Sequence, residues 1–208
     1  MPEPVPNYLR RPALTEKLTA AITPGSALLL EAPSGYGKTH ALSAAFRETS
    51  RSPDTLRWLG LTGQENDAGR LLALLEIALI PPGATSRQSG HQKASSNMDA
   101  LALLLSDPHW NAPNGDSVLV VDNVGTVANP AAIALLQQLI ENIPSGLALV
   151  MVSRRPLPFE THTFELEGRF HRIGADSLEL TRLETFEFFH AVVNRNQLTT
   201  VAVEHLYS

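Results

Sequence analysis

The sequence predicts an α/β fold, a three-layer αβα sandwich in which a mainly parallel sheet of five strands lies between helices. Short apolar runs alternate along the chain with segments of helical periodicity, as they do in parallel sheets with crossover helices. Residues Val118 to Val121 form a continuous apolar run, which is typical of a strand buried on both faces. A turn of small residues, Ala32 to Thr39, joins the first strand to a helix-forming segment.

Strands are expected where a short apolar run is bounded by turn residues. These runs occupy residues 27–32, 56–61, 118–122, 147–153 and 170–173. Helices are expected where apolar residues recur at helical spacing and where Pro, Gly or Asp-Pro ends the pattern. These segments are residues 14–22, 40–48, 68–80, 98–105, 130–142 and 183–193.

The other segments predict irregular structure. Residues 1–12 hold four prolines and are expected to form an extended arm. Residues 81–97 and 107–117 are rich in turn-forming residues and predict loops. A further short segment with spaced apolar residues follows at 199–207.

The composition limits the classes of function. With 208 residues, 43% of them hydrophobic, the chain is long enough for one sizeable domain with a real core. The net charge of −5 argues against strong nucleic-acid binding by these residues, because phosphate neutralisation needs a basic surface. The chain has no cysteine, no apolar run near the ~18 residues of a membrane span, and no signal-peptide pattern. We therefore expect a cytoplasmic protein that does not enter a membrane.

Residues Ala32 to Thr39 read Ala-Pro-Ser-Gly-Tyr-Gly-Lys-Thr, the pattern of a phosphate-binding loop. Glycines let such a loop curl so that its N–H groups point at an anion, and the following helix adds its positive end. Lys38 is expected to add a full charge for the β- and γ-phosphates, and Thr39 a hydroxyl for Mg²⁺. We therefore predict nucleotide contacts from Pro33, Ser34, Gly35, Tyr36, Gly37, Lys38, Thr39 and His40.

The strict form of this motif has glycine where this chain has Ala32. Alanine adopts most turn conformations other than those with positive φ, so the loop is expected to form. The alternative is an ordinary strand–turn–helix corner that contains Gly-Lys-Thr without binding phosphate. The apolar strand before the turn and the helical segment after it favour the phosphate-binding interpretation.

Asp122 ends the apolar strand that begins at Val118. Ligands of parallel sheets bind at the carboxyl ends of the strands, so Asp122 and the phosphate-binding loop are expected to converge. An apolar strand that ends in Asp has the pattern of a Walker B strand, whose carboxylate would hold Mg²⁺ opposite Thr39. Alone, Asp122 would more simply cap a turn; beside the loop, the magnesium role is favoured.

Two further side chains bear on the chemistry. Many ATPases place a second carboxylate directly after the first, but this chain has Asn123. An amide can position water but cannot accept its proton, and a general base typically contributes ~10²–10⁴-fold, so hydrolysis is expected to be slow at most. Arg154 follows the fourth strand and is expected to contact the γ-phosphate; the alternative is a solvated loop arginine. The predicted catalytic residues are Lys38, Asp122, Asn123 and Arg154.

Together these motifs resemble the nucleotide-binding domain of STAND-class P-loop ATPases, and most closely that of the MalT/LuxR-type, ATP-dependent transcriptional regulators. Arg11 to Leu18 is similar to the family pattern R-P-x-L-x-x-x-L, and the loop is similar to A-P-A-G-Y-G-K-T. Trp58 to Leu61 with Glu65 to Asp67 resembles W-x-x-L…D-N-D, and Val150 to Arg154 resembles the family strand that ends in Ser-Arg. Asn123 departs from the family, which usually has a second acid there.

The resemblance implies a P-loop NTPase domain over residues 1–180 and the start of a helical lid over 181–208. It adds Arg11 to the expected nucleotide contacts and implies ATP or ADP with Mg²⁺ as cofactors. In such proteins ATP favours an open, self-associating form and ADP a closed form, so nucleotide-dependent self-association is expected. DNA would be bound only through a C-terminal helix-turn-helix, which in the family follows the segment present here.

Three functions are compatible with the sequence. The favoured hypothesis is an ATP/ADP-binding switch domain of a signal-responsive transcriptional regulator, with slow hydrolysis at most. The alternatives are a conventional P-loop or AAA-type ATPase or kinase, and a degenerate interaction module without catalysis. Fast turnover would favour the first alternative, and failure to bind any nucleotide would favour the second.

Overall fold

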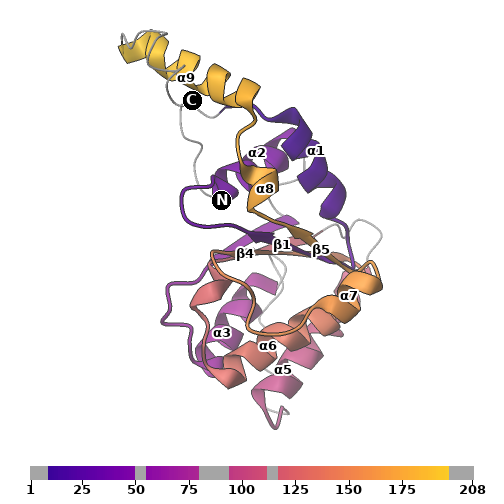
Figure 1. Ribbon diagram of the computed structural model, residues 1–208. Coiled ribbons are helices and arrows are strands. Elements are labelled where there is room, and N and C mark those ends of the chain that lie inside the picture. The colour runs from indigo at the N-terminus through magenta and orange to yellow at the C-terminus, as the bar shows by residue number, and fades with distance from the viewer. Residues whose placement is uncertain (1–8, 50–54, 80–93, 112–116, 197–208) are drawn as a thin grey trace.

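The computed structural model describes residues 9–49, 55–79, 94–111 and 117–196. Figure 1 shows a central sheet with helices on both sides. The strands are β1 (Ala27–Glu31), β2 (Leu56–Gly60), β3 (Ser117–Asp122), β4 (Leu147–Ser153) and β5 (Phe170–Ile173). The α-helices are α1 (Pro12–Ala21), α2 (Lys38–Glu48), α3 (Ala68–Leu79), α5 (Asn97–Leu105), α6 (Pro130–Glu141), α7 (His162–Leu166), α8 (Ala175–Leu178) and α9 (Arg182–Asn196). Two 3₁₀ turns are η2 (Pro108–Asn111) and η3 (Val124–Thr126).

The five strands form one sheet in the order β2-β3-β4-β1-β5, and each neighbouring pair is parallel. β4 lies in the middle, and all of its residues are buried. The register brings the strand ends together, because Glu31 pairs with Ser153, and Asp122 pairs with both Gly60 and Val152. The carboxyl ends of β1, β2, β3 and β4 therefore meet at one edge, where parallel sheets bind ligands.

Alternate residues of the strands fill two separate cores. Leu28 and Leu30 of β1 pack with the buried faces of α1, α2 and α8, whereas Leu29 packs with those of α3, α5 and α6. In Figure 1 the first group of helices lies above the sheet and the second group below it. The three-layer αβα sandwich predicted from the sequence is therefore confirmed.

The observed elements differ from the expected ones mainly at their ends. α2 begins at Lys38 rather than at position 40, so Lys38 and Thr39 belong to its first turn. The helices α7 and α8 are not among the predicted elements, because five and four residues are too few to display a helical repeat. Most of the arm expected at 1–12, most of the loop expected at 81–97 and the segment expected at 199–207 lie outside the described residues.

None of the helices in the described ranges combines the length and the apolar character needed to span a membrane.

Candidate nucleotide-binding site

The loop between β1 and α2 is built on two glycines with positive φ. Gly35 has a φ of 91° and Gly37 one of 74°, a region that residues with a Cβ rarely adopt. Gly37 is also the N-cap of α2, and its carbonyl accepts a hydrogen bond from the Ala41 N–H at 2.8 Å. Ala32 has no positive φ, since among the described residues only Asn123 combines a side chain with positive φ. The alanine that departs from the strict motif is therefore compatible with this loop.

We expect the two loop positions to respond differently to substitution. Gly37→Ala forces a Cβ into the left-handed region at a cost of about 1–2 kcal/mol, which corresponds to roughly a tenfold loss of nucleotide affinity. Ala32→Gly is expected to leave the affinity unchanged, because the position requires no special φ. Calorimetric titration of both variants with MgADP checks this difference, and equal losses in the two variants would contradict it.

Lys38 points back into the loop that precedes it. Its Nζ donates hydrogen bonds to the carbonyls of Ala32 and Pro33 at 2.5 and 2.7 Å, and the residue is only 8% exposed. Burial lowers the pKa of Lys38, the positive charge of Arg154 lowers it further, and Asp122 acts in the opposite direction. Lys38 and Arg154 repel each other in this cleft, and an anion placed between them would stabilise both charges.

Thr39 and Asp122 bring two oxygen ligands together at the edge of the sheet. Thr39 lies in the first turn of α2, Asp122 is the last residue of β3, and the Thr39 hydroxyl donates to Asp122 Oδ2 at 3.4 Å. Oxygens that share one Mg²⁺ at ~2.1 Å lie about 3 Å apart. The pair therefore fits two adjacent positions of a magnesium octahedron, which phosphate oxygens and water usually complete.

Asn123 has an unusual backbone conformation, and its side chain is hydrogen-bonded to the residue that follows β2. It has a φ of 67°, which Asn adopts more readily than most residues other than glycine. Its Nδ2 donates to the carbonyl of Leu61, the residue after β2, at 2.9 Å. Asn123 lines the same cleft as Asp122, but a side-chain amide offers no group that takes a proton from water.

A tight turn after β4 presents Arg154 to the cleft. Ser153 is fully buried; its hydroxyl donates to the Arg155 carbonyl at 2.5 Å and accepts from the Arg155 N–H at 3.2 Å. Arg154 lies between these two residues, is exposed, and lines the same cleft as Lys38. Gly125 of η3 packs against this turn, because a Cβ built on Gly125 would lie 2.8 Å from Ser153 Oγ.

Gly125→Ala is expected to destabilise the fold, because the new Cβ would lie 2.8 Å from the Oγ of Ser153, a buried residue whose hydroxyl already makes two hydrogen bonds. Overpacking of this kind typically costs about 1–3 kcal/mol, which thermal unfolding followed by circular dichroism can measure. Gly60→Ala is the matched control, because a Cβ built there meets no atom within 4 Å. An unfolding temperature of Gly125→Ala equal to that of the wild type would contradict the expected clash.

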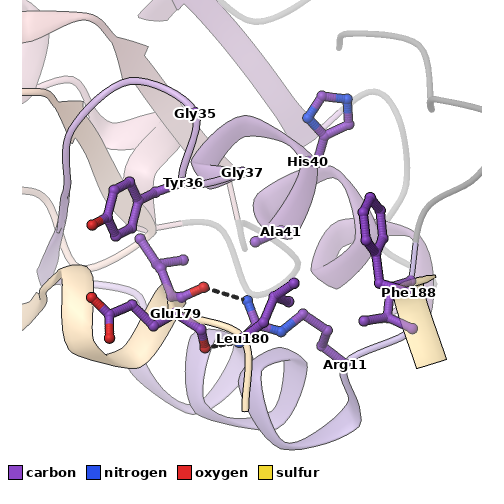
Figure 2. Close-up of a pocket in the computed structure, with 11 residues that line it drawn as sticks. Arg11, Gly35, Tyr36, Gly37, His40, Ala41, Glu179, Leu180 and Phe188 are labelled. Carbon is purple, nitrogen blue, oxygen red and sulfur yellow. Dashed lines mark hydrogen bonds between the residues drawn. The ribbon is translucent and has the colours of Figure 1, made fainter. Parts of the chain in front are cut away.

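Two hollows meet at the phosphate-binding loop. The first is a polar cleft of about 540 Å³ over the carboxyl ends of the strands. The second is a mostly apolar pocket of about 560 Å³, and Figure 2 shows it with Tyr36 and Phe188 on its walls. Gly35, Gly37 and His40 line both hollows. The loop therefore separates a polar compartment from an apolar one, as a ligand with a charged part and an apolar part requires.

Comparisons with known proteins bear on this arrangement. No protein-family model matches the chain. Among solved structures it is similar to a Walker-type ATPase of Pyrococcus abyssi, with a TM-score of 0.56 and 14% identity over 93% of this chain and 60% of that one. It is also similar to a chain of the HORMA:CdnC:Trip13 complex of E. coli MS115-1, with a TM-score of 0.59 and 12% identity over 96% of this chain and 73% of that one. The chain has the P-loop NTPase fold. It spans 60% of the length of the Pyrococcus protein.

Most of the predicted site residues of this P-loop fold line one of the two hollows. The polar cleft is lined by Ser34, Gly35, Gly37, Lys38, Thr39, His40, Asp122, Asn123 and Arg154. Tyr36 and Arg11 line the apolar pocket. Pro33 contributes its carbonyl, which accepts the hydrogen bond from Lys38.

The structure adds residues that the motifs do not contain. The additional residues of the polar cleft are Gly60, Leu61, Val152 and Ser153. They lie at the ends of the strands on either side of β3, and this position in a parallel sheet is the signal that could have indicated them. The additional residues of the apolar pocket include Leu178, Glu179, Leu180 and Phe188. No local sequence pattern indicates these four residues. They follow β5 in the chain, far from the loop in sequence, and only the tertiary fold brings them to the pocket.

Arg11 directs its guanidinium toward these C-terminal residues. Nη1 donates to the carbonyl of Leu178 and Nη2 to that of Glu179, both at 2.7 Å, and Nε donates to Glu184 Oε1 at 2.8 Å. These bonds use most of the donors that a guanidinium offers. Arg11 thus forms part of the pocket wall, and its direct bond to a nucleotide stays a prediction.

Proposed function

We propose that the chain is an ATP- and ADP-binding switch domain of a signal-responsive regulator of the MalT/LuxR type, which hydrolyses ATP slowly at most. The observation that carries the proposal is the meeting of Lys38, Thr39, Asp122 and Arg154 in one cleft. These side chains come from α2, β3 and the turn after β4. Together they offer the charges and the oxygen ligands that a polyphosphate with Mg²⁺ needs.

Each part of the site has a role in this proposal. Lys38 and the loop N–H groups hold the β- and γ-phosphates, while Thr39 and Asp122 hold Mg²⁺, which neutralises phosphate charge when bound. The apolar pocket between the loop and Phe188 takes the base, because apolar walls suit a planar ring. Arg154 contacts the γ-phosphate and thereby distinguishes ATP from ADP, so that the two nucleotides favour different conformations.

Slow hydrolysis follows from the residue after Asp122. Asn123 cannot act as a general base, and its side-chain amide nitrogen donates a hydrogen bond to the carbonyl of Leu61. A nucleotide that stays intact for a long time suits a switch, whose state must outlast the signal, better than a motor.

The regulatory part of the proposal rests on the resemblance of the loop, the entry segment and the strand ends to the MalT/LuxR-type family. We propose with it the division into a nucleotide-binding domain over 1–180 and the start of a lid over 181–208, a cytoplasmic location and self-association in the ATP-bound state. DNA binding is assigned to no residue of this segment.

A conventional P-loop ATPase is the second candidate, supported by the likeness to a protein described as a Walker-type ATPase. Calorimetry with MgATP and MgADP, combined with an assay of phosphate release, separates the functions. Binding of both nucleotides with turnover far below about 1 s⁻¹ supports the switch, whereas several turnovers per second favour the conventional enzyme. Absence of binding to either nucleotide would leave only a degenerate interaction module.

A further inference from the structure

An ion pair joins two distant parts of the chain beside the apolar pocket. Arg11 is 8% exposed, and its guanidinium donates to both carboxylate oxygens of Glu184, at 2.8 and 3.2 Å, across 173 positions of sequence. Figure 2 shows dashed bonds from Arg11 to the segment before α9. Hydrogen bonding from Arg11 lowers the pKa of Glu184. Two-point charge-assisted bonds that are shielded from water are stronger than exposed ion pairs.

This ion pair matters because the described side chains of α9, Arg182 to His190, have little apolar attachment to the rest of the structure. No side chain from Arg182 to His190 is buried, and Leu183, Phe186 and Phe188 are exposed. Figure 1 shows α9 reaching away from the sheet and from the helices that cover it. Apolar burial, the main source of packing energy in proteins, therefore contributes little to holding residues 182–190 in place.

α9 and the segment before it form one wall of the apolar pocket. Leu180 and Phe188 line the pocket from this side, and Leu9 and Arg11 line it from the N-terminal side. Arg11 bridges the two walls, whereas Glu184 is not among the lining residues. A displacement of α9 would therefore open the pocket without altering the phosphate-binding loop.

We infer that Arg11 and Glu184 form a latch that keeps α9 over the pocket and so slows the release of a bound nucleotide. Glu184 is a positioning residue, which acts through Arg11 and touches no ligand. The inference rests on the proposed function, because it takes the pocket to hold the base of a nucleotide. It adds a control of the dissociation rate that is separate from the phosphate-binding residues.

The release of the fluorescent nucleotide mant-ADP tests the latch in the full 208-residue chain. Protein loaded with Mg²⁺ and mant-ADP is mixed with excess ADP, and the loss of fluorescence is followed by stopped flow. Glu184→Ala is expected to raise the release rate at least about tenfold, and Glu184→Gln, which keeps an acceptor but loses the charge, by a smaller factor. Arg11→Ala is expected to raise the release rate at least as much, because it also removes the hydrogen bonds to the carbonyls of Leu178 and Glu179. The double variant is expected to release no faster than Arg11→Ala, because Glu184 acts through Arg11. A wild-type release rate in Glu184→Ala overturns the inference.

Thr181→Ala and Arg10→Ala are the matched controls. Thr181 Oγ1 accepts a hydrogen bond from the Glu184 N–H at 3.2 Å, so Thr181→Ala weakens the cap of α9 but leaves the ion pair intact. Arg10 forms an exposed pair with Glu48, which is expected to contribute little. Both variants are expected to release mant-ADP at the wild-type rate. A rise in Thr181→Ala equal to that in Glu184→Ala would assign the effect to helix capping and overturn the latch.

Hydrogen exchange distinguishes a failure of the latch from a failure of the proposed function. Without nucleotide, the amides of Arg182 to His190 are expected to exchange faster in Arg11→Ala and Glu184→Ala than in the wild type and Arg10→Ala. If the wild type does not retain mant-ADP but this contrast appears, the nucleotide proposal fails while the latch is supported. Equal exchange in all variants overturns the latch, whatever the nucleotide result.

Discussion

Replacing Lys38 by alanine is expected to remove measurable binding of MgATP and MgADP. Lys38 lines the cleft at the start of α2 and is 8% exposed, so its charge acts on a phosphate with little screening by water. A hydrogen bond to a charged group contributes about 1.5–3 kcal/mol, and the loss of two such bonds lowers the affinity by a factor on the order of 100 or more. Calorimetric titration at physiological salt measures the change.

Arg47→Ala is the control for this variant, because Arg47 is an exposed cation in the last turn of the same helix. It is expected to bind both nucleotides as the wild type does. Lys38→Ala also removes the two bonds that Lys38 donates to the carbonyls of Ala32 and Pro33, so its unfolding temperature should be measured alongside. A folded Lys38→Ala variant that binds MgATP with wild-type affinity would falsify the phosphate-binding role of the loop.

Replacing Asp122 by alanine is expected to abolish the dependence of nucleotide binding on Mg²⁺. In the wild type, ATP should bind more tightly with Mg²⁺ than in EDTA, because Thr39 and Asp122, whose side chains lie together, are proposed to supply two oxygens for the ion. In Asp122→Ala this difference is expected to disappear. In EDTA the variant should bind ATP at least as tightly as the wild type, because a carboxylate that repels the phosphates has been removed.

Asp122→Ala is expected to weaken ATP binding in the presence of Mg²⁺ but not in EDTA. This contrast makes the test specific. A variant that merely unfolds would bind less tightly in EDTA as well as with Mg²⁺. Thr39→Ser keeps the hydroxyl and is expected to retain the Mg²⁺ dependence, whereas Thr39→Ala is expected to lose part of it. A wild-type response to Mg²⁺ in Asp122→Ala would place the metal ligand elsewhere.

The loop and the strands could be predicted because their signals are local. The apolar run of β4 is buried throughout, and such a run identifies a central strand wherever it occurs. Gly35 and Gly37 have the positive φ that a curled loop requires. Asp122 could be placed beside the loop because parallel strands direct their carboxyl ends to the same edge.

Asn123 could be assessed only in part. The absence of a second acid is visible in the sequence, and it predicts slow hydrolysis. The positive φ and the bond to Leu61 come from the meeting of β2 and β3, and they show why an asparagine suits this position. The residue type therefore supports the expectation of slow hydrolysis, whereas the structural reason for an asparagine at this position could not be predicted from the sequence.

The sequence by itself determined the α/β class, the phosphate-binding loop and the pairing of Thr39 with Asp122, because periodicity, glycine φ preference and strand direction act over short distances. Only the tertiary structure decided which segments enclose the apolar pocket and that Arg11 bonds to Glu184 across 173 positions. The physical reason is that α8 and α9 carry no binding pattern of their own. They reach the loop through the parallel pairing of β5 with β1, which returns the chain to the first strand and so places its late residues beside its earliest described ones.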